Sequence, residues 1–181
     1  HLSFEIMRND TLDIAMGGTT GQSIPFPPLS LYKDDDEEPN YANVATSVAL
    51  RKENVNILDA YETHDYDFSG TKSFDKNTGY RSTSFLTVPL LNREREVIGV
   101  LQLINARDEK NIVVPFSGEI QPIIEALSSQ AAVALENQLL LAAQRELLES
   151  FIKLIASAID DKSPYTGGHC QRVPEITKML A

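Results

Sequence analysis

Apolar side chains recur at alternating steps of four and three residues along the last third of the chain, and this pattern strongly constrains the fold. The positions are 120, 124, 127, 131, 134, 138, 141, 145, 148, 152, 155 and 159. All carry isoleucine, leucine or alanine except Gln138 and Arg145. Such spacing is typical of the seam of a coiled coil. A helix of about 40 residues extends for roughly 60 Å, so we expect it to leave the globular core.

A second apolar row widens this face near its end, at Leu140, Leu147, Phe151, Leu154 and Ala158. It is compatible with more than two helices meeting there. A helix packed only on its own sheet would explain positions 120 to 138 but not 139 to 159. We therefore expect a parallel homodimer through this helix, with a monomer as the alternative.

The charge balance argues against nucleic acid as a partner. The 181 residues include 26 acidic and 16 basic ones, a formal charge of −10, which repels phosphate backbones and anionic lipid. Cys170 is the only cysteine, which excludes an intrachain disulfide and favours a reducing, cytoplasmic location. No apolar run has the roughly 18 residues of a spanning helix, so we expect no membrane contact within this chain. Because the chain begins at His1 and enters strand-like sequence at once, we expect residues upstream of it.

The first half of the chain alternates between short apolar runs and turns. Residues 2–7 and 11–16 predict two strands, with Asn9 and Asp10 as the turn of a hairpin. Three prolines in 23–32 predict an irregular, extended connection. A short helix is expected over 43–53, followed by a strand from Val55.

The middle of the chain predicts the core of a sheet. Residues 83–91 and 96–106 are rich in β-branched and apolar side chains and are joined by a charged turn, so we expect an antiparallel pair of central strands. Before them, residues 62–79 are polar and contain glycine, which indicates a functional loop with about one helical turn. After them, a helix is expected from about Ser117, with Pro122 in its first turn.

This order of elements, with the stretch FDKNTGYRSTSFLTVPLLNREREVIGVLQLINA at 74–106, resembles a GAF domain. The resemblance implies an α+β fold, a six-stranded antiparallel sheet between helices, and a small-molecule sensor. We expect the GAF-like domain at 1–138, without its N-terminal helix, and a coiled-coil-like linker at 139–162. The resemblance also places Tyr80, Arg81 and Ser84 beside the ligand cavity.

Arg81 is the candidate that we expect to grip a phosphate or carboxylate, because a guanidinium binds either through two parallel hydrogen bonds. The alternative is a salt bridge to Asp75, Asp67 or Glu62.

Aromatic side chains could stack on a flat ligand such as a nucleotide base, or simply close the cavity as core. They are Phe68, Phe74 and Tyr80. Asn105 is a further candidate for ligand binding, or it satisfies backbone groups of the following turn. The adjacent His64 and Asp65 could form a metal or general-base pair, with solvation in the loop as the alternative.

GAF domains of cyclic-nucleotide phosphodiesterases carry a signature that this chain matches in part. Asn105 and Phe116 fit its first and middle places, but Ala106 holds the lysine place and Ile120 and Gln121 hold the acidic pair. The salt link of the signature cannot form, and this departure argues against cyclic-nucleotide binding. We therefore keep cyclic-nucleotide binding only as an alternative function. A ligand-free dimerisation scaffold is another.

The stretch AIDDKSPYTGGHCQRV at 158–173 resembles the first signature of HD-GYP phosphodiesterases, which hydrolyse cyclic di-GMP. The resemblance implies that 163–181 begin such a domain and that His169 is a metal ligand in the intact domain, which needs a pair of divalent ions, iron or manganese. Tyr165 stands where some members have a glutamate ligand, which favours two metal ions over three. One histidine does not hold a catalytic metal, so within this chain we expect no cofactor, no catalytic residue and His169 in a capping or solvent-facing role. We expect a bacterial signalling protein in which the sensor controls the phosphodiesterase.

Overall fold

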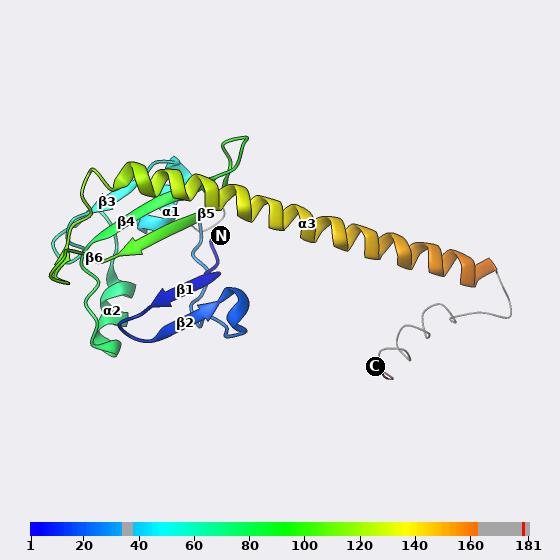
Figure 1. Ribbon diagram of the computed structural model, residues 1–181, viewed down its shortest axis with the longest axis horizontal. Coiled ribbons are helices and arrows are strands. Elements are labelled where there is room, and N and C mark those ends of the chain that lie inside the picture. Colours follow the sequence, from blue (N-terminus) through cyan, green and yellow to red (C-terminus); the bar gives the residue numbers. More distant parts are fainter. Residues whose placement is uncertain (34–37, 163–178, 180–181) are drawn as a thin grey trace. The chain divides into compact units, whose positions relative to one another are not determined.

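The computed structural model of the protein describes residues 1–33, 38–162 and 179, and Figure 1 shows its ribbon. It contains two compact units, His1–Val133 and Ala134–Ala181. The first unit ends just before the predicted domain limit at 138. The predicted HD-GYP segment at 163–181, with His169, lies outside the described residues apart from residue 179.

The first unit has a three-stranded antiparallel sheet in the order β3 (Val55–Ile57), β4 (Phe85–Leu91), β5 (Val97–Ile104). The register pairs Phe85 with Ile104 and runs to Leu90 opposite Gly99, with an irregularity before Leu91. The antiparallel pair predicted from 83–91 and 96–106 is therefore confirmed. Both strands were predicted to be central, but only β4 has a neighbour on each side. Strand β5 lies at the edge of this sheet, because it pairs with β4 alone.

The α+β class is confirmed, but where one sheet of six strands was expected, the described residues form seven strands in three small sheets. The others are the hairpin of β1 (Ile6–Asn9) with β2 (Ile14–Gly17), and the pair β6 (Ala106–Arg107) with β7 (Val113–Val114). Asn105 separates β5 from β6 because its φ of 60° breaks the extended backbone. In Figure 1 the hairpin lies on the β5 side of the sheet.

The first hairpin has a longer turn than predicted. Asn9 pairs with Ile14, so Asp10 to Asp13 form the loop and the second strand begins three residues later than expected. The side chain of Asn9 accepts a hydrogen bond from the backbone N–H of Leu12 at 3.1 Å. This contact stabilises a wide turn where a two-residue turn was predicted.

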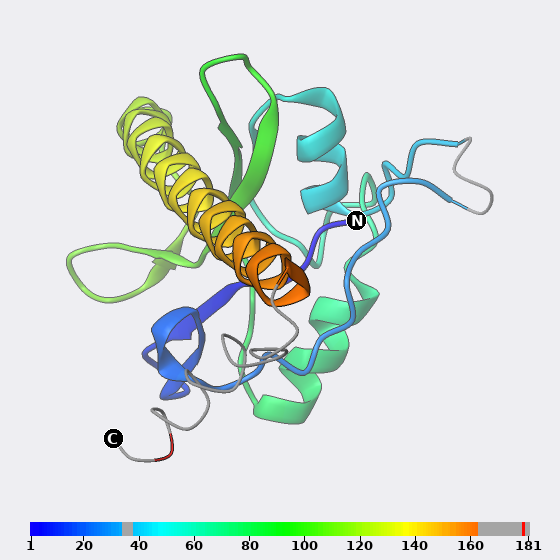
Figure 2. The same ribbon diagram turned by 90° about the vertical axis from the view of Figure 1, so that its right-hand side faces the viewer.

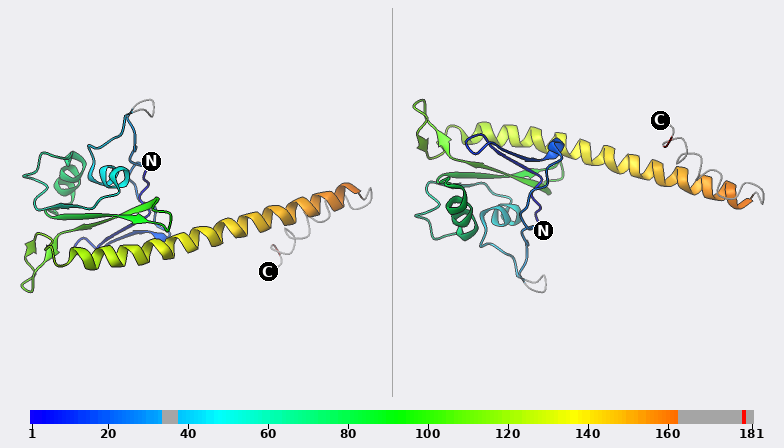
Figure 3. Two further views of the ribbon diagram at one scale, coloured as in Figure 1. Left: turned by 90° about the horizontal axis from the view of Figure 1, so that it is seen from above. Right: turned by 90° about the horizontal axis from the view of Figure 1, so that it is seen from below.

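Helices cover both faces of the sheet in the first unit. Figures 2 and 3 show α1 (Val44–Arg51) and α2 (Ser69–Thr78) on one face and the first turns of α3 (Gln121–Lys162) on the other. The short helix over 43–53 is confirmed: Asn43 caps α1 by accepting from Ala45 N–H at 2.9 Å. Pro122 is the second residue of α3, as predicted.

Residues 62–79 contain a full helix rather than one helical turn. Helix α2 has ten residues and ends at Gly79, whose φ of 72° places it in the left-handed region. The N–H of Gly79 donates to the carbonyl of Asp75 at 2.8 Å, a common way for helices to end.

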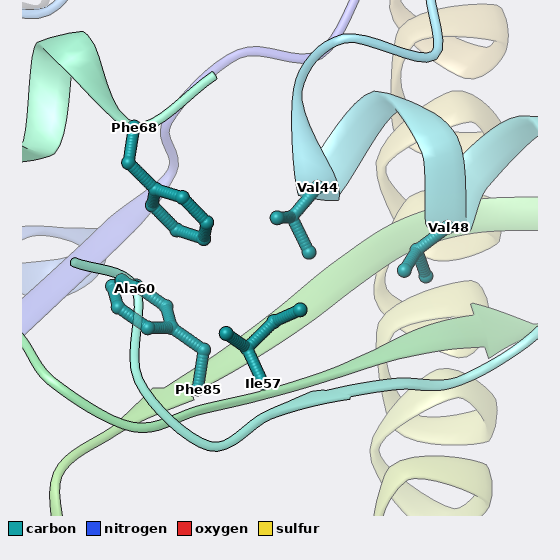
Figure 4. Packing of buried hydrophobic residues seen from close by; sticks show 6 residues of the cluster. All are labelled: Val44, Val48, Ile57, Ala60, Phe68 and Phe85. Atoms are coloured by element: carbon teal, nitrogen blue, oxygen red, sulfur yellow. The ribbon is translucent and has the colours of Figure 1, made fainter. Parts of the chain in front are cut away.

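Two apolar clusters form the core, one on each face of the sheet. On the α1 face, Figure 4 shows six side chains together: Val44, Val48, Ile57, Ala60, Phe68 and Phe85. On the α3 face, Leu86, Val88 and Phe116 are buried with Ile124 packed against them. Successive residues of β4 thus point to opposite faces, as the period of two in a strand requires.

The face of α3 that packs in the first unit includes only part of the predicted seam, because Ile124 packs against the buried cluster of Leu86, Val88 and Phe116. Ser128 and Ala132 are buried, whereas the seam residues Ile120 and Leu127 are 38% and 55% exposed. Packing of the helix on its own sheet therefore explains the apolar residue at 124 but not those at 120 and 127. Ile120 and Leu127 remain exposed in this unit.

The second unit contains the remainder of α3, with an apolar surface. The large apolar side chains from Leu139 to Ile159 are between 45% and 71% exposed, including Leu147, Leu148, Phe151 and Ile152. No helix of the described residues is both long and apolar enough to cross a membrane.

Candidate ligand-binding site

Asp75 organises the side of the first unit where the ligand-binding residues were predicted. Asp75 is 3% exposed, and its carboxylate accepts three hydrogen bonds. Ser82 donates two of them, from its N–H at 2.7 Å and its Oγ at 2.8 Å, and the hydroxyl of Tyr61 donates the third at 2.7 Å. These contacts fix the end of α2 to the segment before β4, because a buried carboxylate without such donors would be strongly unfavourable.

The guanidinium of Arg81 lies over the ring of Tyr61 rather than in an ion pair. Its guanidinium carbon is 3.9 Å from the centre of the Tyr61 ring, a cation–π distance, while the arginine side chain is exposed. The ammonium of Lys72 is 5.3 Å from the same ring centre. No salt bridge joins Arg81 to Asp75, Asp67 or Glu62, so that alternative is wrong. Two cations thus lie beside one ring.

The pKa of Tyr61 is raised above its ordinary value. The hydrogen bond that its hydroxyl donates to Asp75 is the largest cause, followed by burial and by the negative charge of Asp75, while the nearby Arg81 opposes the shift. Tyr61 is therefore held neutral as a donor to the carboxylate, with its ring available to the guanidinium.

Asn105 fixes the backbone that carries Arg81. Its side-chain NH₂ donates to the carbonyl of Arg81 at 2.7 Å and to the hydroxyl of Tyr80 at 2.9 Å. Its Oδ1 accepts from the N–H of Thr83 at 2.7 Å and of Ser84 at 3.3 Å. All four hydrogen-bonding positions of the amide are engaged. The backbone groups that it satisfies belong to 81–84, not to the following turn as the alternative expected.

The remaining predicted residues lie in packed positions. Ser84 is fully buried and its Oγ donates to the carbonyl of Val114 at 2.8 Å. Phe68 is 5% exposed, and its ring centre lies 5.1 Å from that of Phe85. Figure 4 shows the two side chains close together. Phe74 is half-buried and meets the ring of Phe26, from the proline-rich connection, at 6.0 Å. The structure thus brings Tyr80, Arg81, Ser84 and Asn105 into one network and leaves the two phenylalanines in packing roles.

Tyr61, Lys72 and Ser82 were not predicted. Tyr61 was interpreted as the end of the strand that begins at Val55. Lys72 belonged to the loop predicted over 62–79, and Ser82 lies between that loop and the strand predicted from residue 83. The helix-ending Gly79, placed four residues after Asp75, is the signal that could have revealed α2 and with it the side of the helix on which Asp75 lies.

No metal centre is formed by the described part of the chain, where no three His, Cys, Asp or Glu side chains come together. His64 and Asp65 are both exposed, in agreement with solvation in the loop.

The sequence matches the family described as GAF domain over residues 19–135. The chain belongs to the GAF domain family. One relative is the dual 3',5'-cyclic-AMP and -GMP phosphodiesterase 11A of Takifugu rubripes, which is 35% identical over 99 residues. The matched residues are 55% of this chain and 10% of that protein. A cGMP-specific 3',5'-cyclic phosphodiesterase of Drosophila virilis is 39% identical over 62 residues, 34% of this chain and 6% of that one. This GAF domain thus spans only a small part of the length of these relatives.

Solved GAF domains resemble the chain more distantly. The GAF domain of a phosphoenolpyruvate-protein phosphotransferase from Coxiella burnetii is 17% identical with a TM-score of 0.43, over 56% of this chain and 54% of that one. The corresponding Acinetobacter domain is 22% identical with a TM-score of 0.42, over 70% and 64%.

Proposed function

We propose that this GAF domain is the sensor of a signalling protein and binds a small anionic molecule, through a phosphate or carboxylate, at Arg81. The observation that carries this proposal is the position of the guanidinium, 3.9 Å from the Tyr61 ring centre and still exposed. The N–H groups of a guanidinium lie in its own plane, so an arginine held over an aromatic ring can still direct two of them at an anion.

The network around Arg81 supports binding because it prepares the site in advance. Asn105 holds the Arg81 carbonyl, and Asp75 holds both Ser82 and Tyr61. The backbone and the stacking partner of the guanidinium are therefore ordered before a ligand arrives, which lowers the entropy cost of binding. Lys72, beside the same ring, adds a second positive charge for the anion.

The test is native mass spectrometry of the purified chain, followed by calorimetric titration with the co-purified molecule, or with inorganic phosphate and cyclic di-GMP as probes if none is found. We expect Arg81→Gln to weaken binding about tenfold, the effect of losing a charge-assisted contact. Arg93→Gln is the matched control, because Arg93 is an exposed arginine in the turn between β4 and β5. Equal binding by both variants would reject the Arg81 site, and a chain that binds nothing would favour the ligand-free scaffold.

Cyclic-nucleotide binding is a second candidate, favoured by the names of the relatives from Takifugu rubripes and Drosophila virilis. The departures at Ala106, Ile120 and Gln121 remain evidence against it. Titration with cyclic GMP and cyclic AMP separates this candidate from other anions, since only a nucleotide site would bind them in preference to inorganic phosphate.

The proposed output is control of an HD-GYP cyclic di-GMP phosphodiesterase, in a bacterial protein that dimerises through α3. The resemblance of residues 158–173 supports the first part, and the exposed apolar surface of α3 from Leu139 to Ile159 supports the second. We assign the metal-dependent chemistry to the intact catalytic domain. Addition of manganese and cyclic di-GMP to this chain is then expected to give no hydrolysis.

A further inference from the structure

The first turns of α3, residues 121–133, have an exposed side without charge. Seven residues between 122 and 131 are exposed, and none of them is charged. Glu125 is the one charged residue of this stretch, and it is half-buried, with its carboxylate accepting hydrogen bonds from the side chains of Asn54 and Gln121. The exposed side of α2, in contrast, carries Lys72 and Lys76. The side of a helix that faces water normally carries charged residues, and the centres of protein interfaces are depleted of them.

Large apolar side chains lie on this uncharged side. Ile123 is 59% exposed and Leu127 is 55% exposed, and Ile120, directly before the helix, is 38% exposed. The steps between them are three and four residues, so the three side chains are neighbours along one side of the helical turn. We call Ile120, Ile123 and Leu127 the outer patch. Apolar side chains that are gathered in this way, without charge around them, indicate a surface that binds another protein.

The outer patch is not covered by the sheet of its own unit. Ser128 and Ala132 are the buried residues of these turns. Successive residues of an α-helix advance by about 100° around its axis, so Ile123 and Leu127 point away from Ser128 and Ala132. Figure 3 shows the first turns of α3 against one face of the sheet, with their other side turned away from it.

The heptad series of α3 favours a second copy of this chain as the partner. Ile120 and Leu127 begin a series with an apolar residue at every seventh position, which continues at 134, 141, 148 and 155. A parallel partner helix that packs along the later part of this series also packs along its first part, because the period is unbroken. The outer patch and the exposed apolar surface after Leu139 therefore fit the same partner.

The charge of the chain also favours an identical partner at this place. Each copy has a formal charge of −10, so two copies repel each other over most of their surfaces. In a parallel pair, the outer patch of one copy lies opposite the outer patch of the other, and an uncharged surface can meet itself without repulsion. The exposed Ala131, beside the patch, leaves room for a close approach of the two helices.

We propose that two copies of the chain contact each other within the sensor unit, through Ile120, Ile123 and Leu127 of each. This inference rests on the parallel dimer proposed above and extends its interface to the sensor itself. It also assigns a role to Ile123, which lies outside the seam predicted from the sequence. Because the sheet occupies the seam residue Ile124, the contact between copies moves to the neighbouring Ile123.

Sedimentation equilibrium of the whole chain tests this contact. We expect Ile123→Arg and Leu127→Arg each to weaken the dimer about a hundredfold or more, because each change places two arginines in an apolar interface. Ser129→Arg is the matched control, since Ser129 is exposed in the same turns but on a different side of α3. All three variants add the same charge, so a difference among them reports the position of the residue. Circular dichroism should show that all three remain folded, because the replaced side chains are exposed.

Cysteine crosslinking locates the contact independently. In a Cys170→Ser background, Leu127→Cys should form a disulfide between two chains under mild oxidation, because a parallel pair brings this heptad position within the range of a disulfide. Ser129→Cys in the same background should form none, since Ser129 points away from the partner.

The outcomes separate this inference from the proposed dimer. A dimer that Leu148→Arg dissociates, but that tolerates both Ile123→Arg and Leu127→Arg, would overturn the contact within the sensor and leave the dimer through the later part of α3 intact. A chain that is monomeric at every concentration would overturn both. Growth into larger assemblies would also contradict the contact, because a parallel pair is closed by its two-fold symmetry.

Discussion

The side chain of Asn105 donates a hydrogen bond to the backbone carbonyl of Arg81 at 2.7 Å, across 24 positions of sequence. Asn105 itself occupies a left-handed backbone conformation, with φ of 60°, at the point where β5 ends. Asparagine tolerates this conformation better than most residues. One residue therefore ends a strand and fixes the segment that presents the exposed guanidinium.

Asn105→Ala should lower the free energy of unfolding by about 2 to 4 kcal/mol, because it leaves several buried backbone groups without partners. Chemical denaturation measures the difference. Asn77→Ala is the matched control, since Asn77 is exposed on α2 and its replacement should change stability by about 0.5 kcal/mol or less. A similar effect of both variants would mean that the Asn105 network contributes little to stability.

Tyr61 should make the stability of the domain depend on alkaline pH. Its pKa in the folded protein is raised above 10.0, chiefly by the hydrogen bond to Asp75, so folding favours the neutral hydroxyl. This contribution is fully present below the unfolded pKa and is lost as the pH rises through the higher folded value. Urea denaturation at a series of pH values from neutral to strongly alkaline should show the loss, and Tyr61→Phe should reduce it.

Asp75→Asn provides a separate check on the cause of that shift. It removes the negative charge and weakens the acceptor of the Tyr61 hydroxyl, so the pKa of Tyr61 should fall toward its ordinary value. Phenolate absorbance, compared between this variant and the same variant with Tyr61→Phe, isolates the one tyrosine among six. An unchanged pKa would place the cause elsewhere.

The strongest local patterns predicted their elements well, and the site was harder for a physical reason. Strands β4 and β5 and helix α3 have long apolar runs whose period identifies them. Helix α2 has few apolar residues, and it is held by the buried carboxylate of Asp75 instead. A contact of that kind depends on tertiary structure, which periodicity does not encode.

The same limit applies to the partner of Arg81. The alternative predicted for Arg81 was an ion pair with a nearby carboxylate, but the guanidinium lies over the ring of Tyr61, which comes from the segment after β3. Only the fold brings these residues together. Arg81 itself could be selected because it stands directly before a strongly predicted strand.

Arg145 provides a sharp test of the proposed parallel dimer. It occupies the seam between Leu141 and Leu148, so in a parallel, in-register pair it would face Arg145 of the second copy. Two like charges at such a position oppose association. We therefore expect Arg145→Leu to tighten the dimer about tenfold or more, since it replaces charge repulsion with apolar burial.

Sedimentation equilibrium measures this association, and Lys153→Leu is the matched control. Lys153 follows the seam residue Ile152 and lies away from the seam, so the same exchange of a cation for leucine should leave the dimer almost unchanged. Leu148→Cys in a Cys170→Ser background tests the relative orientation of the two helices. Only a parallel, in-register pair brings the two introduced thiols close enough to form a disulfide. An antiparallel dimer would give no such crosslink and a smaller gain from Arg145→Leu, because the two copies of Arg145 would not face each other. Signals could not then pass along α3 as a parallel pair of helices.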